Sequence, residues 1–127
     1  MLLNTCEPHV GRLVEIRVDA GYTSVVAVDE MIDLIRSTIA LVPADTRVVI
    51  AADWRGCRLM SSEASERALQ MMTNNNPRVE RSAVLTSTSS PVLVLQFLRL
   101  VRESGHPGRR LFTDTRDMGP WLGEVGF

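Results

Sequence analysis

Hydrophobic and polar positions follow two different periods along the chain, and their order predicts strands separated by helices. The stretch "GRLVEIRVDAG" alternates with one apolar face, which is typical of a half-buried strand. Residues 22–46 then repeat apolar side chains at helical spacing until Pro43 stops the pattern. "TRVVIAADW" is a short continuous apolar run, which indicates a strand buried on both faces.

The remaining pattern continues the alternation of strands and helices. Further strands are predicted in residues 78–87 and 109–114, and further helices in residues 61–72, 89–104 and 113–125. The order β-α-β-α-β-α-β-α predicts one α/β domain over residues 1–127, with a mostly parallel sheet of about four strands. Residues 1–10 are expected to form a mobile arm outside this pattern.

Composition and charge argue against several classes of function. The net charge of −1 gives no excess of positive charge for binding nucleic acid or an anionic membrane. No apolar run approaches the roughly 18 residues that a membrane span needs. Cys6 and Cys57 lack the spacing of a metal site, so we expect free thiols, a cytoplasmic location and no metal.

The chain offers no complete catalytic constellation. Its 14 basic residues are all arginine, which excludes a catalytic lysine. Neither His9 nor His106 has a serine or cysteine beside it to form a nucleophile pair. Glycine-rich phosphate loops and GxSxG elbows are also missing from the sequence. We therefore predict that the protein is not an enzyme and needs no cofactor.

The stretch "DWRGCRLMSSEAS" places two serines where a buried strand passes into a helix. In α/β sheets, binding sites gather at the carboxyl ends of strands, where helix N-termini point their free N–H groups outward. Either Ser61 or Ser62 can cap this helix, followed by Glu63 in its first turn. A phosphate on one of these serines would suit the helix dipole. The residues alone favour a cap without a switch.

At this point the sequence resembles the STAS domain, the fold of bacterial anti-sigma-factor antagonists and of the related SpoIIAA-like group. The resemblance rests on "GYTSVVAVDEM…RVVIAADWRGCRLMSSEAS" and on the C-terminal "RRLFTDTRDMGPWL". In the antagonists, a buried strand runs into an Asp-x-x-Gly turn, which Asp53 to Gly56 fits, and then into an Asp-Ser-Ser-Gly motif at a helix start. The resemblance implies the same fold and a protein-interaction module.

The resemblance also bears on phosphorylation. Residues 61–64, Ser-Ser-Glu-Ala, fall on the Asp-Ser-Ser-Gly motif, whose second serine is the phosphorylated one in classical antagonists. Glu63 occupies that position here, so the site is expected to be constitutively anionic. A shift of the alignment by one residue would instead make Ser62 the phosphosite.

Residues 92–101 are too apolar for a helix that buries only one of its faces against a sheet. Eight of these ten residues are apolar, whereas one buried stripe needs fewer. If Val94, Leu98 and Val101 face the sheet, then Leu93, Leu100 and either Leu95 or Phe97 are left over. Surplus apolar surface indicates a partner, a self-association face or a ligand groove. The alternative is a deeply buried helix covered by residues 1–10.

The sequence therefore leads to two functional hypotheses. The first is a regulatory or interaction module without a working phosphoserine switch. It would bind another protein, or itself as a homodimer, through residues Ser61, Ser62, Glu63, Leu93, Phe97 and Leu100. The second is a carrier or sensor of a small hydrophobic, lipid-like ligand, which should show an enclosed apolar pocket, whereas an interaction module should show a filled core and an apolar patch.

Overall fold

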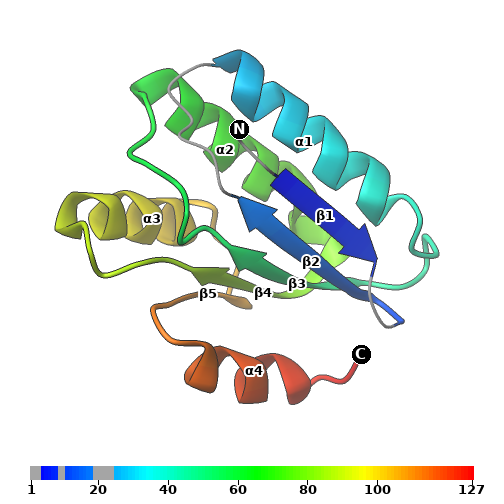
Figure 1. Ribbon diagram of the computed structural model, residues 1–127. Helices are drawn as coiled ribbons and strands as arrows, with labels where there is room; N and C mark the ends of the chain where they lie inside the picture. Colours follow the sequence, from blue (N-terminus) through cyan, green and yellow to red (C-terminus); the bar gives the residue numbers. More distant parts are fainter. Residues whose placement is uncertain (1–3, 9–10, 19–24) are drawn as a thin grey trace.

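The computed structural model describes residues 4–8, 11–18 and 25–127, and of residues 4–8 only the backbone. Its strands form one five-stranded sheet in the order β1-β2-β3-β4-β5 (Figure 1). The strand bounds are β1 Asn4–Pro8, β2 Leu13–Val18, β3 Val48–Asp53, β4 Val79–Leu85 and β5 Arg109–Phe112. The helix bounds are α1 Val25–Ile39, α2 Ser62–Asn75, α3 Pro91–Glu103 and α4 Thr115–Gly123, with the short 3₁₀ helix η1 Asn76–Arg78 after α2.

The sheet confirms the predicted α/β architecture and adds one strand. Strands β2 to β5 are parallel, and they coincide with the four strands that the periodicity predicts. Strand β1 pairs antiparallel with β2 at the edge and lies within residues 1–10, for which the sequence predicted only an arm. Its sequence, "NTCEP", shows no alternation and ends in proline, so it carries little strand signal. At this edge, residues 4–8 lie beside β2 and do not cover α3.

The helices divide between the two faces of the sheet. Helices α1, α2 and α3 cover one face, as right-handed crossovers between sequential parallel strands require, and α4 lies alone on the other (Figure 1). The larger core forms under the three helices, around residues such as Val14, Ile35 and Phe97. The smaller one forms between Leu122 of α4 and alternate residues of β3 to β5, including Phe112. Because α4 lies over β4 and β5, the second face of β2 and β3 remains partly open.

The predicted orientation of α3 is wrong. The structure buries Leu93, Phe97 and Leu100 against the sheet, instead of Val94, Leu98 and Val101. The exposed apolar residues of this helix are Val92, Leu95 and Leu98. Spacings of three and four residues fit both stripes equally well in a helix that is apolar on most sides. The choice depends on a tertiary contact, the packing of Phe97 on Trp54 with ring centroids 5.3 Å apart.

No helix within the described residues is both long enough and apolar enough to cross a bilayer.

Candidate functional site

The start of α2 lies at the carboxyl edge of the sheet, as the sequence predicts. Ser61 is the N-cap: its backbone is extended, and its Oγ accepts a hydrogen bond of 3.1 Å from the amide of Ala64. Ser62 is the first helical residue, and both it and Glu63 are exposed. Ser62 and Glu63 also border an open groove against the first residue of α1, Val25. Of the two candidate caps, the structure thus selects Ser61 and leaves Ser62 at the surface.

The turn after β3 is held by a bidentate ion pair. Arg55 donates from Nε to Oδ1 of Asp53 at 3.0 Å and from Nη2 to Oδ2 at 2.8 Å, and its backbone amide also donates to Oδ1. Partial burial tends to raise the pKa of Asp53. The hydrogen bonds from Arg55 and the charges of Arg55 and Arg17 outweigh that effect, so the pKa lies below its usual value. The carboxylate therefore serves to fix the turn.

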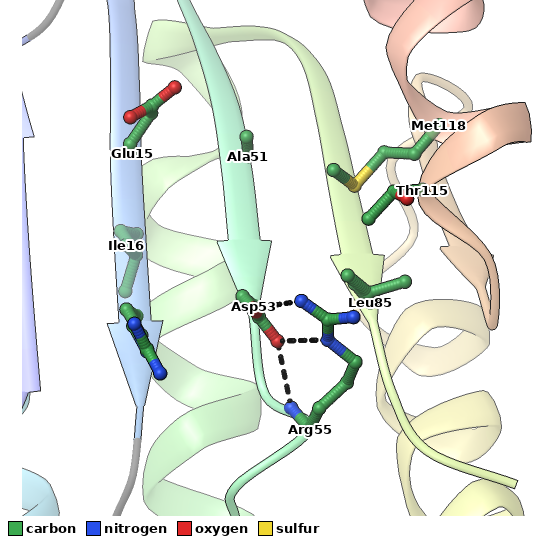
Figure 2. Close-up of a pocket in the computed structure, with 9 residues that line it drawn as sticks. Glu15, Ile16, Ala51, Asp53, Arg55, Leu85, Thr115 and Met118 are labelled. Atoms are coloured by element: carbon green, nitrogen blue, oxygen red, sulfur yellow. Dashed lines mark hydrogen bonds and ion pairs between the residues drawn. The ribbon is translucent and has the colours of Figure 1, made fainter.

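The same ion pair borders a pocket on the open part of the second sheet face. Figure 2 shows Glu15 on β2, the Asp53–Arg55 pair at the end of β3, and Thr115 and Met118 reaching in from α4. The pocket measures about 300 Å³, and Ala51 and Leu85 also line it. Its border includes two carboxylates and, with Arg17, two guanidinium groups. An enclosed apolar pocket of the kind expected for a hydrophobic-ligand carrier would lack such a charged border.

The segment between this turn and α2 is fastened to α3 by one side chain. The Gln96 amide accepts from the backbone N–H of Met60 at 3.1 Å and donates to the Met60 carbonyl at 3.0 Å. Cys57 in the same segment is buried, and its Sγ donates to the carbonyl of Arg58 at 3.1 Å, whereas Leu59 is exposed. Gln96 thus joins the residue before the α2 cap to the middle of α3.

Exposed apolar side chains gather on and beside α3. Within the described residues, seven large apolar side chains are exposed, and four of them belong to α3 or to the segment that Gln96 holds: Leu59, Val92, Leu95 and Leu98. We call these four residues the α3 patch. Arg99 on the same helix bonds to Glu66 of α2 at 2.6 Å and to Glu103 at 2.6 Å, so ion pairs flank the patch.

The structure therefore brings together part of the predicted site. Ser61, Ser62 and Glu63 lie at the α2 start, while Leu93, Phe97 and Leu100 are core residues and are not available to a partner without unfolding. Sequence reasoning did not find Leu59 or the role of Gln96. The polar Gln96 inside an apolar helix is the one signal in the sequence that indicates a specific contact there.

The histidines and acidic residues add no reactive centre to the described residues. The Nδ1 atom of His106 accepts from the amide of Gly108 at 2.8 Å, so its Nε2 donates to the carbonyl of Val79 at 2.7 Å and the ring ties a turn to β4. His9 lies outside the described residues. No group of three histidine, cysteine, aspartate or glutamate side chains that could hold a metal occurs in the described part of the chain.

Comparison with known proteins identifies the fold. No protein-family model matches the chain, and no curated protein matches it. Among solved structures, it is similar to an uncharacterised protein of the DUF3478 family with a SpoIIAA-like fold from Shewanella loihica PV-4. The TM-score is 0.65 at 18% sequence identity, over 95% of this chain and 93% of that chain. The chain is therefore an α/β protein with a SpoIIAA-like fold, as its resemblance to that group implied.

Proposed function

We propose that this protein is a non-catalytic regulatory module that binds another protein, or a second copy of itself, through the α3 patch and the adjacent start of α2. The observation that carries the proposal is the grouping of four of the seven exposed large apolar side chains of the described residues at one place. Grouped apolar residues at the surface are typical of interaction sites, whereas scattered ones need no explanation.

The core supports an interaction module over a ligand carrier. The cavity that lies within the larger core measures about 30 Å³, which is far below the size of a lipid-like molecule. The pocket beside α4 is large enough for a small molecule, but four charged side chains border it. The second hypothesis, a carrier of a hydrophobic ligand, therefore has the weaker support.

The start of α2 contributes polar recognition to this surface. Glu63 is exposed in the first turn, where a negative charge is favourable beside the helix N-terminus. We infer that Glu63 supplies permanently the charge that a phosphoserine supplies in classical antagonists, so binding would not depend on a kinase. Phosphorylation of Ser62, which is also exposed, would add a second negative charge to the same turn and is the alternative.

The test is the double substitution Leu95→Glu with Leu98→Glu. Both side chains are exposed, so the variant should fold normally and keep the unfolding midpoint of the wild type within a few degrees. We expect it to lose self-association in analytical ultracentrifugation, or to lose the proteins that the wild type captures from lysate of the source cells.

The control is Leu41→Glu, which replaces an exposed leucine outside the patch by the same charged residue and adds one of the two negative charges of the double variant. This control should keep every interaction of the wild type. The proposal is wrong if the wild type is monomeric at millimolar concentration and captures the same proteins as the double variant. Ser62→Ala and Glu63→Gln then distinguish the two views of the α2 start, because only the second should weaken binding if the fixed charge is what the partner recognises.

A further inference from the structure

Arg109 is a buried cation whose charge no carboxylate balances within the described residues. It lies at the start of β5 and is only 6% exposed. Its Nη1 donates to Asn76 Oδ1 at 2.8 Å and to Ser104 Oγ at 2.9 Å, and its Nη2 donates to the carbonyl of Met72 at 3.4 Å. These acceptors are neutral. The side chain therefore lies where α2 and α3 end, and the negative ends of two helix dipoles compensate its charge only in part.

The structure leaves one nitrogen of this guanidinium without a protein partner. Nε of Arg109 is buried and donates to no atom of the described residues. Burial also lowers the pKa of Arg109 to about 10. A buried charge that lacks an opposite charge destabilises the folded state, so binding an anion here would be favourable.

A cavity lies beside this group in the larger core. It measures about 30 Å³, and Arg109, Ser82 and Asn75 give it a polar end. The rest of its wall is mostly apolar, with Ile35 and Val84 among the lining residues. The polar end carries a positive charge, and none of its side chains is a carboxylate.

Size and chemistry together select the ligand class. A cavity of about 30 Å³ holds one particle slightly larger than a water molecule. Phosphate, sulfate and carboxylates have several heavy atoms and do not fit. We propose that this cavity is a binding site for a monatomic anion, a halide such as chloride, held by Nε of Arg109 and by the hydroxyl of Ser82.

The structure also offers a route into the cavity. Met71 and Asn75 line both the cavity and an open groove of about 320 Å³ between α1 and α2. Rotation of the flexible Met71 side chain would open the path between them. The ion would then lie between α2 and the sheet and would stabilise the packing of these elements by balancing the charge of Arg109, without changing the outer surface.

The experiment compares halide with an anion too large to enter. Thermal unfolding of the wild type is measured in sodium chloride and in sodium gluconate at equal ionic strength and pH, and crystals soaked in bromide are examined for anomalous scattering. We expect a bromide peak beside Arg109 and a midpoint higher by about 5 °C when chloride is ten times above its dissociation constant.

Two variants separate this site from general salt effects. Arg109→Gln should abolish the difference between the two salts. Arg110→Gln, the matched control, removes the next charge along β5, which is exposed and stacks on Trp121, and should keep the difference. If Arg109→Gln does not fold, Ser82→Ala serves instead and should reduce the difference. Equal midpoints in both salts, or density for water alone without a bromide peak, would overturn the proposal.

Discussion

The orientation of α3 can be tested with two alanine substitutions two residues apart. Phe97→Ala removes a side chain that is fully buried and packs on Trp54 at a ring distance of 5.3 Å. Leu95→Ala removes a side chain that is 64% exposed. Both substitutions change a large apolar residue into the best helix former, so differences in helix propensity between them are small.

The structure sets very different magnitudes for the two changes. Truncation of a buried phenylalanine to alanine lowers the free energy of unfolding by about 3–5 kcal/mol, because the lost transfer free energy and the cavity left behind both contribute. Full burial of a leucine is worth about 1.5–3 kcal/mol, and Leu95 is only about a third buried, so its loss should cost roughly 0.5–1 kcal/mol at most. The expected difference is therefore at least about 2 kcal/mol.

Urea unfolding followed by tryptophan fluorescence measures both values, and an unchanged m-value shows that the two variants unfold in the same way. Trp54 reports directly on the environment of Phe97. If the loss for Phe97→Ala leaves too little stability to measure, Phe97→Leu gives a smaller loss on the same scale. A Leu95→Ala variant as unstable as Phe97→Ala would refute both the orientation of α3 and the α3 patch.

Three further predictions follow from local contacts. Ser61→Ala should lower the free energy of unfolding by about 0.5–2 kcal/mol because it removes the cap, and Ser62→Ala by little; equal losses would contradict the cap assignment. Asp53→Asn should be less stable than the wild type near neutral pH. Because the folded pKa of Asp53 is lowered, that difference should disappear in urea titrations as pH falls through it, and a constant difference would refute the ion pair's role. Gly11→Ala should lower the free energy of unfolding by at least about 1 kcal/mol, because φ is +56° and the new Cβ would clash with the carbonyl oxygen of Phe127. The control Gly123→Ala has open space around the new Cβ and should not lower it.

The sequence determines the order of the elements and most of their bounds. Periods of two and 3.6 residues are visible wherever one face of an element is buried, as in Leu13–Val18 and in α1. The caps are also local: Ser90 caps α3 and Asp114 caps α4, and both lie at the start of the predicted helical ranges 89–104 and 113–125. These features depend on neighbours in the chain, so a single sequence contains the information that predicts them.

The missing parts depend on contacts between distant residues. Strand β1 owes its place to pairing with β2, and its own residues show no strand pattern. The position of α4 on the second face could not be predicted, because no parallel strand follows it and the handedness of crossovers does not apply. The pocket between β2 and α4 depends on that position. Likewise, the α3 patch depends on which stripe of an apolar helix meets Trp54.

If the proposed function is correct, the contact of Gln96 with Met60 would couple the α3 patch to the α2 start. Met60 directly precedes the Ser61 cap, and both backbone groups of Met60 bond to the Gln96 amide. A partner that rotates or shifts α3 would therefore also move Met60, the residue before the cap. A change of charge at Ser62 or Glu63 would in turn affect the position of α3 through the same two hydrogen bonds. Hydrophobic contact supplies most of the affinity at such a surface, while the charged rim supplies orientation and selectivity. Gln96→Leu would keep a side chain of similar volume but remove both hydrogen bonds that hold the segment 57–60. It should therefore leave the fold intact and weaken partner binding, if the two parts of the surface act together.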